Sequence, residues 1–202
     1  MKKITIALIM VISLIAPIQT MAERVTQNGT IIEPLEQNIE QIIDEITSEP
    51  RPINSDAIQN VKEYISEYFG NLGYDNIEYQ KFEYNDENNE NAIRHSSQAD
   101  VFLASTAEDA IVDGIGENII VTKNSSIDTT KNLIISAHYD SAEDSVGAND
   151  NGSGVAAVLE LARILKDTEI PYNIKFILFS GEEKYMLGSR WYVGNLSEDE
   201  RK

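Results

Sequence analysis

Residues 133–154 read LIISAHYDSAEDSVGANDNGSG, and residues 174–183 read IKFILFSGEE. The first segment begins with a continuous apolar run at 133–137, which is typical of a strand buried on both faces. A second such run covers 174–179, and between the two runs residues 155–165 have the pattern of a helix that is apolar on most sides. Strand, helix and strand with short links predict a βαβ unit in a parallel sheet.

Polar residues stand at the ends of these elements. HYD at 138–140 follows the first strand, GANDNGSG at 147–154 opens the helix, and GEE at 181–183 follows the second strand. Ligands of an open parallel sheet bind outside the carboxyl ends of its strands, so the three clusters should meet at one edge. Several carboxylates gathered there would repel one another, and a divalent metal would offset their charge. Because the chain has no cysteine, any metal must be held by His, Asp and Glu.

Each cluster taken alone has an ordinary structural explanation. A single histidine beside an apolar strand is usually a hydrogen-bonded core or surface residue. The run at 149–152 is strong turn chemistry, Ser153 is a good helix cap, and paired glutamates favour the N-terminus of a following helix through its dipole. The convergence of all three clusters on one edge favours a metal site over these explanations.

A calcium-binding EF-hand loop is a second metal hypothesis for part of this segment. Its positions one, three, five, six and twelve would be Asn149, Asn151, Ser153, Gly154 and Glu160. The first position lacks its usual Asp, and no helix precedes the loop. Since Glu160 falls inside a pattern that continues as one helix from residue 155, we do not favour this hypothesis.

Further elements are predicted on both sides of the βαβ unit. Apolar residues recur at helical spacing in three segments, alternate or run together in three others, and are sparse in one acidic run. The predicted elements are helices at 35–46, 55–69 and 188–193, strands at 77–84, 100–104 and 117–122, and an exposed loop at 85–91. Together they predict an α/β fold with a mostly parallel central sheet flanked by helices.

The first residues have the features of a secretory signal peptide. Lys2 and Lys3 precede an apolar stretch at 4–18, and TMA at 20–22 offers the small residues that a signal peptidase reads. A membrane anchor is the alternative, but the stretch is short for a span, which needs about 20 residues. We therefore expect residues 1–22 to be removed.

The remaining chain divides into a tail at 23–34, which lacks periodicity, and a domain at 35–202. The formal net charge of −18 at pH 7 makes nucleic acid and anionic lipid improbable partners, because both are negatively charged. We expect no stable membrane association once the signal is cleaved. An exported protein without cysteine is ordinary for bacteria, so we expect a secreted or extracytoplasmic bacterial protein.

The order and spacing of these motifs resemble the signature of the M28 metallopeptidase family. The segments that carry the resemblance are 138–141 (HYDS), 147–154 (GANDNGSG), 160–163 (ELAR), 179–183 (FSGEE) and 188–189 (GS), with 51–55 and 73–74 fitting the opening helices of the family. The resemblance runs from about residue 35 to the last residue. It implies a three-layer zinc-peptidase fold.

The resemblance also implies a role for each matching residue. His138 would bind one zinc ion, Asp150 would bridge two, and Glu183 would bind the second. Glu182 would be the general base that takes a proton from the attacking water. Asp140 would hold the imidazole of His138 by accepting its other N–H. The family pattern further implies that the peptide bond after Asp150 is cis, so that Asp150 can face both metals.

The sequence departs from the family pattern in two ways. Tyr185 and Met186 stand where the family usually has Gly and Leu, which would alter a turn or a pocket wall. The family also uses a later Asp and a later His as metal ligands, and nothing after Glu183 matches them. The only other histidine, His95, lies far upstream. We therefore expect a C-terminally incomplete domain in which each zinc has two of its protein ligands.

The sequence favours an exported two-zinc aminopeptidase that removes N-terminal residues from peptide substrates. One alternative is another amide-processing enzyme on the same scaffold, and another is an inactive or truncated peptidase-like binding domain. Glu182 argues against a pure binding domain, because such a domain has no use for a general base.

Overall fold

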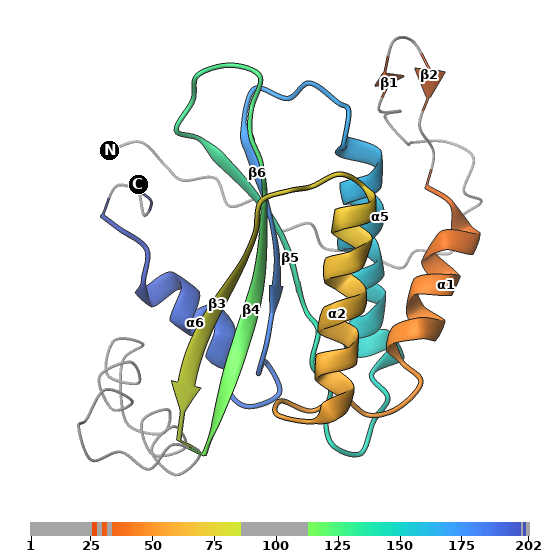
Figure 1. The fold of residues 1–202 in the computed structure, drawn as a ribbon, viewed down its shortest axis with the longest axis vertical. Coiled ribbons are helices and arrows are strands. Elements are labelled where there is room, and N and C mark those ends of the chain that lie inside the picture. The colour runs from red at the N-terminus through yellow and green to blue at the C-terminus, as the bar shows by residue number, and fades with distance from the viewer. Residues whose placement is uncertain (1–25, 28–29, 32–33, 86–112, 199, 201–202) are drawn as a thin grey trace, which may run out of the picture.

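The computed structural model describes residues 26–27, 30–31, 34–85, 113–198 and 200. Its elements are β1 (Thr26–Gln27), β2 (Thr30–Ile31), α1 (Glu36–Ile46), α2 (Asp56–Asn71), β3 (Ile77–Tyr84), β4 (Gly114–Lys123), β5 (Asn132–His138), the short π-type turn η1 (Ala148–Gly152), α5 (Ser153–Leu165), β6 (Asn173–Phe179) and α6 (Leu187–Gly194). Figure 1 shows their arrangement. None of the helices in these described ranges has the length and hydropathy needed to span a membrane.

Most of the elements predicted from the sequence are present with similar bounds. The predicted signal peptide at 1–22 and the strand candidate at 100–104 lie outside the described residues, as does most of the predicted loop at 85–91. Asn85, the one described residue of that loop, is buried rather than exposed.

The central sheet has four strands in the order β3-β4-β6-β5. β5 and β6 are parallel, whereas β4 is antiparallel to both β3 and β6. The prediction of a mostly parallel sheet is therefore wrong, and the sheet is mixed. Parallel neighbours need a crossover of a dozen or more residues, usually a helix. Of the links between sheet strands that the structure describes in full, the one between β5 and β6 contains such a helix, whereas the segment from β4 to β5, residues 124–131, is too short for it.

The βαβ unit itself is confirmed. α5 lies between β5 and β6 in the chain, and the two strands pair in parallel from Asn132 with Asn173 to His138 with Phe179. Both strands thus end at the same level, at the lower end of the sheet in Figure 1. The segments that follow β5 and β6 therefore begin side by side, because His138 is paired with Phe179.

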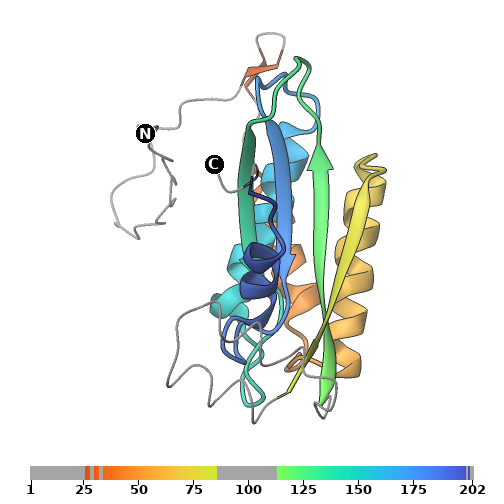
Figure 2. The same ribbon diagram turned by 90° about the vertical axis from the view of Figure 1, so that its left-hand side faces the viewer.

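Helices cover both faces of the sheet and make three layers. α1, α2 and α5 lie on one face and α6 on the other, as Figures 1 and 2 show. The alternation along β4 explains this arrangement. Ile119 and Val121 belong to the large core beneath the three helices, whereas Ile120 packs with Ile177 and Tyr192 under α6.

β5 lies at an edge of this sheet and is not buried along its whole length. Leu133 is 40% exposed and Ile134 46%, while Ala137 and His138 are buried. The prediction of a strand buried on both faces is therefore wrong for its first half. An apolar run does not distinguish an edge strand from a central one, because both carry side chains suited to a pleated surface.

Candidate active site

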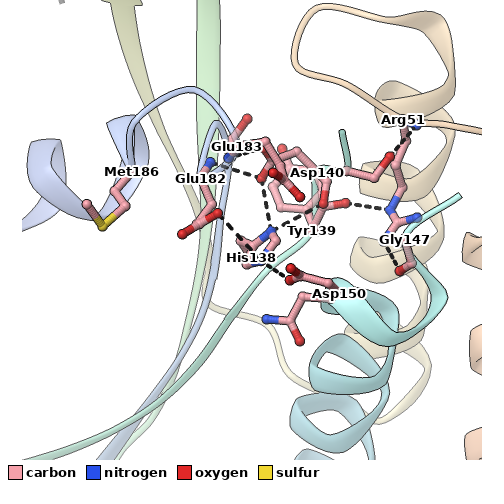
Figure 3. Close-up of polar contacts among 12 residues, drawn as sticks. Arg51, His138, Tyr139, Asp140, Gly147, Asp150, Glu182, Glu183 and Met186 are labelled. Carbon is pink, nitrogen blue, oxygen red and sulfur yellow. Dashed lines mark hydrogen bonds and ion pairs between the residues drawn. The ribbon is translucent and has the colours of Figure 1, made fainter. Parts of the chain in front are cut away.

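The ends of β5 and β6 and the turn η1 bring five titratable side chains together (Figure 3). His138 is the last residue of β5 and Asp140 follows that strand. Glu182 and Glu183 follow β6, and Asp150 lies in η1 before α5. We call these five residues the rim cluster. The sequence predicted that they would meet at one edge, and the structure brings all of them there.

His138 is at the centre of the rim cluster and is only 8% exposed. Its Nε2 lies 3.0 Å from Asp150 Oδ1 and 3.9 Å from Glu182 Oε2. Its Nδ1 lies 3.2 Å from the backbone oxygen of Asp140 and 3.5 Å from the Asp140 carboxylate. Burial lowers the pKa of His138, but hydrogen bonding and charge from Asp140, followed by Glu182 and Asp150, raise it to about 9.

Asp140 makes contacts that the sequence did not reveal. Its carboxylate is buried and accepts hydrogen bonds from the backbone N–H groups of Glu182 and Glu183, both at 3.1 Å. The side chain expected only to orient His138 therefore also ties the end of β5 to the segment after β6. No local pattern signals these bonds, because their partners lie about forty residues away along the chain.

The loop that carries Asp150 has an irregular backbone. Gly147 has a φ of 57°, a left-handed conformation that glycine adopts readily, and the Asp150–Asn151 peptide bond is cis. The cis bond that the family resemblance implied is thus present. The side chain of Asp150 is 76% exposed and so faces solvent next to His138.

The side chain of Arg51 fixes the backbone that leads into this loop. It is fully buried, and its guanidinium donates to the backbone oxygens of Tyr139 at 2.7 Å, Gly147 at 3.1 Å and Val146. Its own N–H donates to Ser141 Oγ at 2.9 Å. Burial lowers the pKa of Arg51, and the negative charge of Asp140 opposes that shift. The sequence marked Arg51 only as part of a family segment, since partners this distant leave no local pattern.

Glu182 and Glu183 begin a tight turn. Tyr185 and Met186, the two departures from the family pattern, have φ values of 68° and 60° and expose their side chains. Residues other than glycine reach this left-handed region at a cost of about 1–2 kcal/mol each. Burial, and then the charge of Asp150, raise the pKa of Glu183, while His138 opposes the shift.

Comparison with known proteins identifies the segment that contains the rim cluster. Residues 118–202 match the model of peptidase family M28. This segment is similar to that family, and we call it the M28 segment. The M28 segment includes β4, the βαβ unit and all five residues of the rim cluster.

Proteins similar in sequence to this chain include aminopeptidases and membrane proteases. Aminopeptidase YwaD of Bacillus subtilis is 45% identical over 94 residues, which are 46% of this chain and 21% of that protein. A vacuolar membrane protease of Schizosaccharomyces japonicus is 31% identical over 153 residues, which are 75% of this chain and 16% of that protein. The chain thus spans only about a fifth of the length of these curated relatives, or less.

Solved structures share the fold. BSAP, a zinc aminopeptidase from Bacillus subtilis, superposes with a TM-score of 0.67 at 19% identity, covering 85% of this chain and 68% of that one. A glutaminyl cyclase of Porphyromonas gingivalis has a TM-score of 0.57 at 20% identity, covering 78% of this chain and 52% of that one. At these identities the likeness establishes the fold alone.

The EF-hand hypothesis is wrong, because the carboxylate of Glu160 binds residues outside the proposed loop. Its buried carboxylate accepts hydrogen bonds from Leu35 N at 2.8 Å, Asn38 Nδ2 at 2.6 Å and Arg163 Nη2 at 2.7 Å. It therefore joins α5 to α1 and does not belong to the loop at 147–154.

The rim cluster suits a divalent metal only in part. Within the described residues no three His, Asp or Glu side chains are gathered closely enough to hold an ion by themselves. The pair formed by His138 and Asp150 does fit one ion. Two ligands of a tetrahedral zinc with bonds of about 2.0–2.1 Å stand about 3.3 Å apart, and these two are 3.0 Å apart.

Proposed function

We propose that this chain is part of an exported metal-dependent peptidase, a two-zinc aminopeptidase that hydrolyses N-terminal residues of peptides. The observation that carries the proposal is the meeting of His138, Asp150, Glu182 and Glu183 at the end of β5 and β6, inside an M28 segment. The names of the relatives and the fold shared with a zinc aminopeptidase support the same activity.

The residues of the rim cluster divide into metal ligands and helpers. His138 Nε2 and the carboxylates of Asp150 and Glu183 would hold the zinc ions. Asp140 would keep the imidazole in place through Nδ1, where its backbone oxygen already lies at 3.2 Å. Zinc, when bound, would supply the positive charge that acidifies a water molecule and polarises the scissile carbonyl.

Glu182 would move the protons. Its side chain is less buried than that of His138, and its Oε2 lies 3.9 Å from the imidazole, at the solvent side of the rim cluster. This carboxylate would take a proton from the attacking water and deliver it to the leaving amine as the C–N bond breaks. The backbone bond from Glu182 N to Asp140 fixes where the carboxylate starts.

Two substitutions in the complete protein test these roles. Glu182→Gln should keep its zinc and lose about 10²- to 10⁴-fold in kcat, because an amide cannot accept the proton. Asp150→Asn should lose zinc and activity together. Zinc content by elemental analysis and hydrolysis of amino-acid anilides should be measured side by side, with Glu143→Gln, an exposed carboxylate of the same loop region, as the control.

Three outcomes would contradict the proposal. Unchanged hydrolysis in Glu182→Gln would remove the assigned base. A wild type that binds zinc but cleaves neither peptide nor anilide would favour a binding domain. Cyclisation of N-terminal glutaminyl peptides in place of cleavage would favour the amide-processing alternative, the activity in the name of one structural neighbour.

Export is the second part of the proposal. The basic start, the apolar stretch at 4–18 and the small residues at 20–22 support a cleaved signal peptide. Mass spectrometry of secreted material should find Glu23 as the first residue. Intact residues 1–22 in a membrane fraction would instead support an anchor.

A further inference from the structure

Asn118 is a fully buried polar side chain in β4, on the face of the sheet that α6 covers. Its Nδ2 donates to the backbone oxygen of Gly188 and to Gln80 Oε1, both at 2.9 Å. Its Oδ1 accepts from the backbone N–H of Ser180 at 3.1 Å. A buried amide is costly unless paired, and a fully paired one specifies a single local geometry.

The two backbone groups that Asn118 binds are the two ends of one turn. Ser180 follows β6 and Gly188 lies at the start of α6, and Gly188 N donates to Ser180 O at 3.0 Å. Two further bonds nest inside this pair, from Leu187 N to Gly181 O at 2.9 Å and from Met186 N to Glu182 O at 2.8 Å. The amide of Asn118 thus closes the base of the turn that carries both glutamates and Met186, which are labelled in Figure 3.

Gly188 is required at this base for reasons of space. A Cβ there would lie 2.2 Å from Asn118 Oδ1 and 2.4 Å from Ser180 O. Both distances are far below van der Waals contact, so any larger residue would push the amide or the Ser180 backbone away. The close approach of the two ends of the turn therefore depends on Asn118 and Gly188 together.

We propose that Asn118 is a positioning residue, which holds Glu182 and Glu183 at the rim cluster by closing the base of their turn. Asp140 holds the same two residues at the tip of the turn through their N–H groups. The hydrogen bonds of Asn118 described above run to Gln80 and to the backbone of Ser180 and Gly188, so it acts on the glutamates through the backbone. The roles of the two glutamates in metal binding and proton transfer rest on the proposed function. Their placement by Asn118 rests on the hydrogen bonds alone.

Amide hydrogen exchange of the 202-residue chain tests whether Asn118 fixes the turn that carries Glu182 and Glu183, and it needs no activity measurement. In Asn118→Ala, the amides of Glu182 and Glu183 should lose about tenfold or more of their protection, because the turn opens more often. Gly188→Ala should give the same loss of protection, because its added Cβ would clash with Asn118 Oδ1 and Ser180 O. Amides within β6 should keep their protection in both variants.

Two substitutions serve as controls. Asn38→Ala removes a hydrogen-bonding amide that binds Glu160 and Tyr68 on the opposite side of the sheet. Gly70→Ala adds a methyl group where nothing lies within 4 Å. Neither should change the exchange of the two glutamate amides.

Zinc binding and kinetics in the complete protein test the consequence. The apparent zinc affinity of Asn118→Ala should fall about tenfold, since supporting contacts of metal ligands have effects of that size. Its kcat should fall about 10- to 100-fold with KM changed less than about twofold, because a misplacement of about 1 Å in a catalytic group has that effect. A merely structural role would lower the amount of folded protein and leave kcat per folded molecule unchanged.

Two results would overturn the inference. One is unchanged exchange at both glutamates in Asn118→Ala and Gly188→Ala, and the other is an equal loss of protection throughout β6. If the wild type cleaves no substrate, the proposed function fails, and the exchange comparison still decides whether Asn118 holds the turn.

Discussion

Glu160 in the helical layer and the carboxylates of the rim cluster have opposite surroundings. Glu160 meets a guanidinium, an amide and a backbone N–H. Burial alone would raise the pKa of Glu160, but Arg163, Leu35 and Asn38 lower it on balance. At the rim cluster, Asp150 and Glu182 both approach one imidazole, and the pKa of Glu183 is raised by burial and by the charge of Asp150.

This difference separates carboxylates that stabilise the fold from carboxylates placed for chemistry. A paired, hydrogen-bonded Glu160 favours the folded state in its charged form. The carboxylates of Asp150, Glu182 and Glu183 do not stabilise one another, and positive charge, from His138 or from a bound cation, offsets their repulsion. Substitutions at Glu160 and Glu183 test that division, and substitutions at Arg51 and Tyr185 test the backbone around the rim cluster. They are ordered from the largest expected effect to the smallest.

Arg51→Met should cause the largest loss of stability. It would leave the backbone oxygens of Tyr139, Val146 and Gly147 without the donor that now satisfies them. We expect the free energy of unfolding to fall by about 3 kcal/mol, measured by urea titration. Arg190→Met, in α6, is the control and should change it by less than about 1 kcal/mol. A similar small effect for Arg51→Met would contradict the idea that Arg51 stabilises the backbone between His138 and Asp150.

Glu160→Gln should cause the second largest loss of stability. The free energy of unfolding should fall by about 2 kcal/mol at pH 7, because Arg163 would lose its charged partner. The same change at Glu183 in metal-free protein should stay within about 0.5 kcal/mol. Equal losses at both positions would remove the distinction between the two groups of carboxylates.

Low pH should abolish the difference in the free energy of unfolding between wild type and Glu160→Gln. Its folded pKa is depressed, so its contribution to stability is present above the unfolded value of about 4.3 and is lost as pH falls through the lower folded value. The stability gap between wild type and Glu160→Gln should thus be full above about pH 5 and shrink below about pH 4. Urea titrations across that range would measure it, and a gap that widens with acid would show that the sign is wrong.

Tyr185→Gly should have the smallest effect, and it should stabilise. Glycine adopts the φ of 68° without the steric cost that tyrosine bears, and the exposed ring gives up little packing. We expect a gain of about 0.5–1 kcal/mol. Tyr185→Ala keeps the Cβ and should show no such gain, which makes it the matched control.

The sequence predicted the parts of this molecule that depend on neighbours in the chain. The run at 133–137, the helix at 155–165 and the run at 174–179 predicted the parallel pair, because a crossover helix leaves a pattern of its own. Strand direction elsewhere was predicted wrongly, although the short link at 124–131 already excluded a parallel crossover.

The supporting contacts of the candidate site could not be predicted in this way. Arg51 and Gly147 are separated by 96 residues, and Asn118 and Gly188 by 70. Hydrogen bonds over such separations depend on how the strands are ordered, and no periodicity records them. The metal-ligand hypothesis for His138, Asp150 and Glu183 came from the family resemblance, and it stays a prediction.

The pairing of β5 with β6 sets a limit on how this chain can change in length. His138 stands opposite Phe179 in an unbroken parallel register. Deleting one residue from β6 would move everything after it by about 3.3 Å and turn its side chains to the other face. The segment between α5 and β6, residues 166–172, has no such constraint. Insertions and deletions among proteins of this architecture should therefore collect in that connection and avoid the two strands.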